Sequence, residues 1–352
     1  MKQTPTDDLL QTLTDVDDKD LALLDELANF YDRPGFLIRR ANQIAVSTFM
    51  EDLGELGLTP TQMSSLAVIS ETPEIDQITL ARRIGVDRTT ISMVVNGLVE
   101  HGFVRREQSR NDARKKQIEL TRAGRACSVL ARDNAIANGE RLLKVFDPGE
   151  GEQLASFLRT LIDNVPGRAP EWVRPDGTTK FGTEADFSET FPEQAALYSA
   201  FGFLLRRTHQ TLESVFIDTT RSLRLTPRRY GVLRIINAAQ PVEQISVARW
   251  LALDGSTTAT LVTELVKKGY VVRDPHPTDR RRRHLRLSAE GKALIAKGHP
   301  LAVEASEKAL NVLGEDAETF RNLIRRFIVE NDEFSRVPLE RVVTLALRQA
   351  DA

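Results

Sequence analysis

Two arginine-rich stretches of the sequence have the composition of phosphate-binding loops. The segments RREQSRNDARKK (105–116) and RDPHPTDRRRRHLR (273–286) each carry six Lys or Arg residues against two acidic ones. Cationic side chains at a loop tip bind phosphates, and arginine also inserts into the minor groove of DNA. An aspartate within each stretch can hold a neighbouring arginine through a charge-assisted hydrogen bond. A solvated run of charges is the alternative interpretation. The candidate DNA contacts are Arg110, Asp112, Arg114, Lys115, Asp279, Arg281 and Arg282.

Two other segments have the pattern of helices that enter a DNA groove. On a helical wheel, RTTISMVVNGLVEH (88–101) gathers aliphatic residues on one arc and short polar residues on the opposite arc, and GSTTATLVTELVKK (255–268) keeps this arrangement. The apolar arc would pack on a core, which leaves the polar arc free to bond to base edges. An amphipathic helix with a solvated polar face is the alternative. The candidate reading residues are Arg88, Thr89, Thr90, Ser92, Met93, Asn96, Ser256, Thr257, Thr260 and Thr263.

A pair of adjacent arginines also occurs twice. GFLIRR occupies residues 35–40 and GFLLRR occupies residues 202–207. The apolar residues before each pair indicate partial burial, and a guanidinium beside apolar groups requires an anion. An acidic side chain such as Glu51, Asp52 or Glu55 can supply that anion through a salt bridge within the protein.

All of these features recur at one spacing. Sliding the chain along itself by 167 residues places Leu58-Thr59-Pro60 on Leu225-Thr226-Pro227, Asp112 on Asp279 and Gly124 on Gly291, without a gap. Such a long period excludes the short repeats of a solenoid, so the chain contains a duplicated domain. The expected parts are an acidic N-terminal extension (1–33), copy 1 (34–163), a linker (164–187), copy 2 (188–332) and a C-terminal helix (333–352).

The elements expected in copy 1 would position these side chains. Periodicity and turn residues predict helices at 36–53, 60–70, 78–85, 88–101, 122–146 and 149–163, and strands at 103–107 and 116–120. Copy 2 repeats this order. A short helix, a turn, a second helix and a two-stranded hairpin form a winged helix-turn-helix. The sequence therefore predicts a mainly α fold with small β wings.

Composition limits the remaining function classes. The chain has 352 residues, a net charge of −2 and one cysteine, Cys127, so no internal disulfide framework is expected. No apolar run approaches the roughly 20 residues of a membrane span, and we expect a soluble, cytoplasmic protein without a membrane partner. The histidines lack paired metal spacing, and no nucleotide loop or nucleophile motif is present. We therefore expect no catalysis, no cofactor and no metal, whereas a thiol switch at Cys127 is a weaker hypothesis.

In the order of their elements and in their motifs, both copies resemble the MarR family of bacterial transcription regulators. The resemblance is carried by Leu-Thr-Pro before the second helix, Asp-Arg-Thr-Thr before the recognition helix, and the wing pattern D-x-R-x5-L-T-x-x-G that begins at Asp112. Copy 2 repeats the wing pattern from Asp279, with serine in place of threonine. The resemblance implies a homodimer of winged helices on double-stranded DNA, with repression that a small ligand relieves.

Because two copies lie in one chain, we expect a pseudo-twofold intramolecular dimer and an operator of imperfect symmetry. The family branch that controls aromatic catabolism further implies a small aromatic carboxylate as effector, bound by an early arginine of the first helix. On this basis Arg39 and Arg206 are the first candidate ligand residues, and Arg40 and Arg207 the second. A constitutive or architectural DNA-binding protein is one alternative. An interaction module in which one copy no longer contacts DNA is the other.

Overall fold

The computed structural model consists of two compact units. One comprises residues 1–40, 215–311 and 315–352, and the other comprises residues 41–214 and 312–314. We call the former the copy-2 unit and the latter the copy-1 unit, after the winged helix that each contains. The structure describes residues 18–53, 57–86, 88–108, 116–165, 200–275 and 283–349. Both wing tips, and the predicted linker beyond its first two residues, lie outside the described part of the chain.

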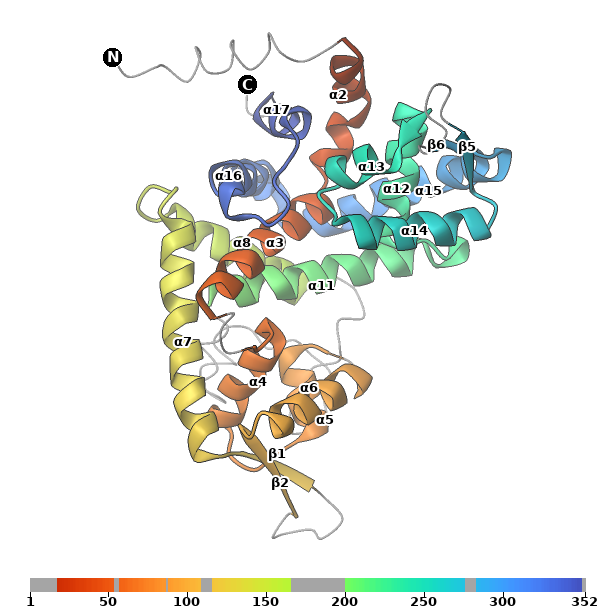
Figure 1. The fold of residues 1–352 in the computed structure, drawn as a ribbon. Coiled ribbons are helices and arrows are strands. Elements are labelled where there is room, and N and C mark those ends of the chain that lie inside the picture. Colours follow the sequence, from red (N-terminus) through yellow and green to blue (C-terminus); the bar gives the residue numbers. More distant parts are fainter. Residues whose placement is uncertain are drawn as a thin grey trace. The chain divides into compact units, whose positions relative to one another are not determined.

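In copy 1, a helix-turn-helix precedes a small antiparallel sheet (Figure 1). The elements are α4 (Pro60–Glu71), β1 (Ile75–Asp76), α5 (Gln77–Ile84), α6 (Arg88–Glu100), β2 (Val104–Gln108) and β3 (Lys116–Leu120). Strand β3 lies between β1 and β2 and is antiparallel to both. The long helix α7 (Arg122–Leu143) packs beside α4, and α8 (Glu150–Asn164) follows it.

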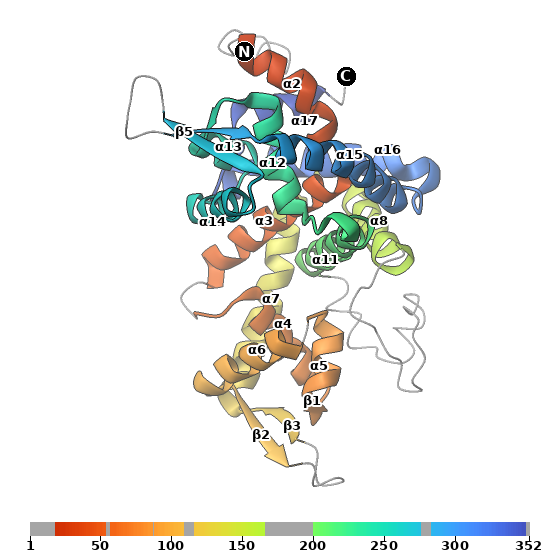
Figure 2. The ribbon, with the colours of Figure 1, turned by 90° about the vertical axis from the view of Figure 1, so that its right-hand side faces the viewer.

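Copy 2 repeats this arrangement, and Figure 2 shows its sheet with the adjoining helices. Its elements are α12 (Pro227–Ala239), β4 (Val242–Glu243), α13 (Gln244–Trp250), α14 (Gly255–Lys267), β5 (Val271–Pro275), β6 (Arg283–Leu287), α15 (Ala289–Leu310) and α16 (Ala317–Glu330). Strand β6 lies between β4 and β5. The mainly helical fold with small β wings is therefore confirmed. The two-residue strands β1 and β4 were missed, because two residues are too few to show a periodic pattern.

The first helix of each copy belongs to both units. These helices are α3 (Pro34–Leu53) and α11 (Phe201–Thr219). Residues 34–40 of α3 belong to the copy-2 unit, whereas residues 201–214 of α11 belong to the copy-1 unit. Each unit thus contains the opening turns of the other copy's first helix, and those turns carry the paired arginines.

Two terminal helices complete the copy-2 unit. Helix α2 (Asp18–Tyr31) begins in the acidic N-terminal extension, and α17 (Arg341–Gln349) lies near the end of the chain. Helix α2 packs against α12 and α17 (Figure 2). Short 3-10 turns lie at Arg221–Leu223, Gly314–Asp316 and Asp332–Phe334. None of the described helices is long and apolar enough to cross a membrane.

The Leu-Thr-Pro pattern starts the first helix of each helix-turn-helix. Thr59 caps α4 by accepting a hydrogen bond from the backbone N–H of Gln62, and the Gln62 side chain accepts one from the N–H of Thr59. This reciprocal capping box satisfies two helix-terminal donors, while Pro60 supplies a preset backbone angle at the first helical position. Thr226 caps α12 by accepting a single hydrogen bond from the backbone N–H of Arg229.

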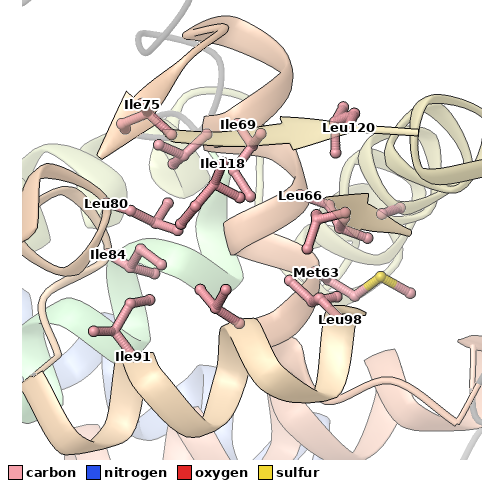
Figure 3. Close-up of a cluster of buried hydrophobic side chains, with 14 of the residues drawn as sticks. Met63, Leu66, Ile69, Ile75, Leu80, Ile84, Ile91, Leu98, Ile118 and Leu120 are labelled. Carbon is pink, nitrogen blue, oxygen red and sulfur yellow. The ribbon is translucent and has the colours of Figure 1, made fainter. Parts of the chain in front are cut away.

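The hydrophobic core of the copy-1 winged helix fixes the orientation of α6. Ile91, Val95 and Leu98 are buried along one face of that helix. They meet aliphatic side chains from α4, α5 and the sheet, including Leu66, Leu80 and Ile118, as Figure 3 shows. Because this face is held in the core, the opposite face of α6 must point outward.

The Leu-Thr-x-x-Gly end of the wing pattern lies where β3 meets α7. Its residues allow the start of α7 to pack closely against the backbone before β2. Thr121 caps α7 by accepting from the N–H of Gly124 at 3.0 Å. A Cβ atom on Gly124 would lie only 1.9 Å from the carbonyl oxygen of Phe103, so glycine is required there. Ser288 and Gly291 repeat the arrangement in copy 2. This part of the pattern positions the wing.

Candidate DNA interface and ligand pocket

Helix α6 presents a polar face with one large apolar side chain in it. Arg88, Thr89, Met93 and Asn96 are exposed, and Met93 retains 63% of its accessible surface. Ser92 and Thr90 are half-buried. The predicted reading residues of copy 1 therefore share the outward side of α6, where hydroxyl, amide and thioether groups can contact base edges and a thymine methyl.

Helix α14 presents the equivalent face in copy 2, with its hydroxyls already engaged. Ser256, Thr260 and Thr263 are exposed, whereas Thr257 is half-buried. The hydroxyls of Ser256 and Thr257 each donate to the carboxylate of Asp254 at 2.6 Å, and the N–H of Thr257 donates to it at 2.7 Å. These hydrogen bonds hold the pKa of Asp254 well below its ordinary value. In the protein without DNA, Ser256 and Thr257 thus serve the N-cap of α14.

A hydrogen bond from the wing to the reading helix occurs in both copies. Arg106 on β2 donates to the side-chain oxygen of Asn96 at 2.6 Å, and Arg273 on β5 donates to the hydroxyl of Thr263 at 3.0 Å. These pairs occupy matching positions in the two copies. We did not select either arginine from the sequence, although the coincidence of Arg106 and Arg273 in the repeat was the available signal.

Cross-strand ion pairs hold the described part of each wing. Arg105 donates to Glu119 at 2.7 Å in copy 1, and Arg286 donates to Asp274 at 2.7 Å in copy 2. The predicted minor-groove residues all lie outside the described part of the chain; they are Arg110, Asp112, Arg114, Lys115, Asp279, Arg281 and Arg282. Their contacts with DNA stay predictions.

The copy-1 unit contains a cavity of about 170 Å³ among α3, α4, α7 and α11. Its lining is mostly apolar and mixes large and small side chains, such as Phe49, Met63, Ala67, Ala131, Ala135 and Phe203. The charged residues of the lining are Glu71 of α4, Arg132 of α7 and Arg206 of α11. An apolar cavity of roughly 150 Å³ is large enough for benzene, so a single aromatic ring fits the observed volume.

The described contacts of the Arg206 guanidinium are with neutral groups. Its guanidinium donates to the hydroxyls of Thr61 at 3.5 Å and Ser64 at 3.3 Å, and it lies 5.1 Å from the ring centroid of Phe203. Burial and the neighbouring charge of Arg207 lower the pKa of Arg206 to about 9, so it stays charged at neutral pH. Within the described part of the chain, no carboxylate acts on this pKa. Long contacts to neutral hydroxyls leave the guanidinium able to bind a carboxylate more strongly.

Arg207, the residue after Arg206, has a packing role. Its side chain is fully buried and donates to the side chain of Gln210 at 2.9 Å. The guanidinium occupies the place of a side chain at Gly85, because its Nη1 lies 1.5 Å from where a Cβ would stand. Gly85 also has a φ of +76° at the end of α5. Glycine at that position therefore makes room for Arg207.

The equivalent arginines of copy 1 are engaged differently in the copy-2 unit. Arg39 donates to the carbonyl oxygen of Leu251 at 2.7 Å and lies 5.0 Å from the ring centroid of Phe36. Arg40 is buried and forms an ion pair with Asp332. The structure thus supports a salt bridge within the protein for Arg40. Its partner is Asp332 and not one of the acids considered from the sequence, Glu51, Asp52 or Glu55.

The weaker sensing hypothesis at Cys127 gains no support from its surroundings. The Cys127 side chain is buried, and burial raises the pKa of its thiol. A raised pKa leaves less of the reactive thiolate at neutral pH. Among the described residues, no group of three or more His, Cys, Asp or Glu side chains is placed to hold a metal ion.

Comparisons with known proteins match both copies. The model of the MarR family matches residues 58–116 and 225–282. The transcriptional regulator HosA of Escherichia coli O111:H- is 31% identical over 105 residues, which are 30% of this chain and 78% of HosA. A putative transcriptional regulatory protein for the hcr operon of Thauera aromatica is 32% identical over 135 residues, 38% of this chain and 81% of that protein. Among solved structures, the PcaV regulator of Streptomyces coelicolor in complex with its natural ligand is 30% identical, covers 37% of this chain and 92% of PcaV, and has a TM-score of 0.35.

Proposed function

Because the chain belongs to the MarR family of transcriptional regulators, we propose that it is a repressor that a small aromatic carboxylate releases from its operator. Proteins of this family bind DNA and are not enzymes, so the chain acts by binding rather than by catalysis. The proposal adds three parts to this established class. They are the use of both copies on one operator, the chemistry of the effector, and the direction of the response.

A single chain supplies both halves of the DNA-binding unit. This part is supported by the assignment of residues 34–40 of α3 to the copy-2 unit and 201–214 of α11 to the copy-1 unit. Two copies that exchange their first helices have the connectivity of a dimer within one polypeptide. Two recognition helices related in this way would meet half-sites about one turn of DNA apart.

The operator departs from perfect symmetry because the two reading faces differ. Copy 1 presents Met93 and Asn96 at positions where copy 2 carries Thr260 and Thr263. A thioether favours an apolar neighbour such as a thymine methyl, whereas a hydroxyl bonds to several base edges. The two half-sites therefore differ in sequence, and the protein binds the operator in one orientation.

The observation that carries the effector proposal is Arg206 at the wall of the copy-1 cavity. A planar guanidinium binds a carboxylate through two parallel hydrogen bonds, and the apolar lining accommodates one ring beside it. Thr61 and Ser64, which contact Arg206 now, would be released or shared on binding. The cavity touches α4 of the helix-turn-helix and also α7, which follows the wing. A ligand there can shift the reading helix relative to the wing.

The test combines operator capture with ligand titration. Genome-wide capture of bound fragments identifies the operator, and fluorescence anisotropy then follows its release by a panel of benzoates and cinnamates. We expect one class of aromatic acid to release wild-type protein, and Arg206→Ala to require roughly 10- to 100-fold more of it. Arg206→Lys is the matched control, because it keeps the charge and loses the planar fork.

Two outcomes would favour other functions. Operator binding that no acid in the panel or metabolite extract weakens would favour a constitutive or architectural DNA-binding protein. Specific binding that survives Arg281→Ala unchanged, but is lost in Arg114→Ala, would favour a chain in which only copy 1 contacts DNA. For a two-copy clamp, both changes should weaken binding and lower its dependence on salt, because each removes a cation that displaces counterions.

A further inference from the structure

Three side chains of the copy-2 unit that contact one another stand at positions equivalent to ones that line the copy-1 cavity. At the repeat spacing, Met63 of α4 corresponds to Tyr230 of α12, and Arg132 of α7 corresponds to His299 of α15. Both Met63 and Arg132 line the cavity in the copy-1 unit. In the copy-2 unit, the Tyr230 ring is 2% exposed and its oxygen lies 3.1 Å from Nδ1 of His299.

A third position of the same cavity is filled from the chain's N-terminal side. Ala200 lines the copy-1 cavity, and its counterpart at the repeat spacing is Arg33. Arg33 donates to the hydroxyl of Tyr230 at 3.0 Å and lies 5.5 Å from the centroid of its ring. Arg33 and His299 thus both contact the hydroxyl of Tyr230, and all three residues stand at positions equivalent to ones that line the copy-1 cavity.

The last turn of α2 adds an aromatic ring to this cluster. Phe30 is buried, and its ring centroid lies 5.6 Å from that of Phe36 and 6.2 Å from that of Tyr230. A Cβ on Gly231 would lie 3.5 Å from the tip of the Phe30 ring. Gly231 corresponds to Ser64, the residue whose hydroxyl contacts the candidate ligand arginine in copy 1. Phe30 therefore lies beside the position that corresponds to Ser64, which lines the copy-1 cavity.

Arg39, the equivalent arginine of the copy-2 unit, already donates a short hydrogen bond to a backbone carbonyl. Arg39, the counterpart of Arg206, donates to the carbonyl oxygen at the end of α13 at 2.7 Å, whereas the hydrogen bonds of Arg206 are 3.3 and 3.5 Å long. A buried guanidinium that already has a short carbonyl contact gains less from a carboxylate than one that has only long contacts to hydroxyls.

We propose that each chain carries one effector site, in the copy-1 unit, and that Phe30 and Tyr230 occupy the equivalent site of the copy-2 unit as a built-in ligand. The proposal rests on the effector function argued above and adds its stoichiometry and asymmetry. One binding event per chain then sets the response, so release from DNA follows a simple hyperbola in effector concentration rather than a sigmoid.

The first experiment counts sites with the ligand chemistry proposed. Isothermal titration of the full-length protein with the benzoate that releases DNA should give one site per chain. Arg206→Ala should weaken binding roughly 10- to 100-fold, and Arg39→Ala should leave it within about twofold. The swap Met63→Tyr, which copies the copy-2 residue into the cavity, should also abolish binding. Two equivalent sites per chain, or loss of binding in Arg39→Ala with retention in Arg206→Ala, would overturn the proposal.

A second experiment does not depend on any carboxylate. Fluorobenzene, observed by fluorine NMR, reports dry cavities of one-ring size. Phe30→Ala should gain one bound resonance over wild type, whereas Phe30→Leu, which still fills the space, should gain none. Thermal unfolding confirms that both variants fold. Should every acid fail while Phe30→Ala gains its resonance, the effector chemistry is wrong but the filled site stands. A folded Phe30→Ala protein without the extra resonance contradicts the filled site directly.

Discussion

The side chains of Asn96 and Thr263 each accept a hydrogen bond from an arginine of the neighbouring strand. The arginines are Arg106 on β2 and Arg273 on β5. The arginine fixes the rotamer of a side chain that would otherwise sample several, and it adds a cation next to the reading face. Such a pair would combine base contact and phosphate attraction in one element, and it recurs in both copies. We propose that it takes part in DNA binding.

We predict that Arg106→Ala lowers operator affinity about tenfold and relaxes base preference in the copy-1 half-site. Loss of the guanidinium frees the Asn96 amide to rotate, so its donor and acceptor no longer face fixed base edges. Competition binding with operators mutated in one half-site measures the preference. Arg105→Ala is the control, because it removes a cation from the same strand whose partner is Glu119. Equal effects of both changes on affinity, with base preference intact, would contradict the prediction.

A second prediction at the residue scale concerns the cap of α14. The pKa of Asp254 is depressed by its hydrogen bonds to Ser256 and Thr257, so its stabilising effect is present above the unfolded carboxyl pKa of about 3.9 and is lost as pH falls below it. Asp254→Ala should reduce the free energy of unfolding by about 1 kcal/mol at pH 7. Urea unfolding between pH 3 and pH 7 should show this difference shrinking in the acid range.

Asp254→Asn separates the charge from the cap. Asparagine keeps a side-chain oxygen for the N–H of Thr257 and does not titrate. Its unfolding free energy at pH 7 should lie between those of wild type and Asp254→Ala, with less change toward acid. If Asp254→Ala and wild type kept the same difference at every pH, the carboxylate would not be the stabilising group.

The sequence around the paired arginines indicates that each pair needs an anion nearby. It does not indicate which acidic residue supplies that anion. Asp332 lies 292 positions from Arg40, and only the tertiary fold brings the two together. The same holds for the cluster of Phe30 and Tyr230, since Phe30 comes from the N-terminal extension and has no signal of its own in the repeat. Local pattern carries information about burial and charge. Contacts between distant segments depend on packing that pattern does not contain.

At the scale of elements, the junction between wing and α7 is the most constrained part of each winged helix. Capping residues and an obligatory glycine recur there in both copies, at Thr121 with Gly124 and at Ser288 with Gly291. The junction sets the angle at which the hairpin leaves the long helix. Its pattern was visible in the sequence and was interpreted as a family signature, whereas the structure shows the steric reason for it.

We predict that Gly124→Ala destabilises the copy-1 winged helix by about 1–3 kcal/mol, because the new methyl group would meet the carbonyl oxygen of Phe103. The backbone must shift to relieve a contact of 1.9 Å. Thermal unfolding followed by circular dichroism measures the loss. Gly139→Ala in the same helix is the control, since its methyl group would stand 3.7 Å from Phe201 and should raise stability by roughly 0.5–1 kcal/mol. Comparable loss in both variants would contradict the prediction, because it would not depend on the close approach of Gly124 to Phe103.

Sequence pattern predicted helices and wing strands well, and their ends less well. Helix α7 ends at Leu143, whereas periodicity extended it to residue 146. The apolar spacing along a helix continues into its C-terminal turn, so the pattern alone does not stop it. Strands β1 and β4 depend on pairing with β3 and β6 across the winged helix, and this long-range pairing leaves no local mark.

At the scale of the whole molecule, fusion of two copies permits differences that a homodimer cannot have. The reading faces of α6 and α14 differ, and so do the sites around Arg206 and Arg39. In a homodimer any substitution appears twice, so both half-sites and both pockets change together. Here selection can act on one half at a time. The proposed oriented operator and the proposed single effector site both follow from this asymmetry.

The orientation on DNA is the most direct test of this asymmetry. We predict that a cleavage reagent attached to Glu107→Cys, on the exposed end of β2, cuts only one flank of the operator. The same reagent attached to Val272→Cys, on the exposed start of β5, should cut only the other flank. Native Cys127 is buried and should not react appreciably. Copies that read equivalent half-sites would bind in both orientations, and each label would then cut both flanks equally. Inverting the captured operator within a longer fragment should move each cut to the opposite end, because the half-sites rather than the flanking DNA set the orientation.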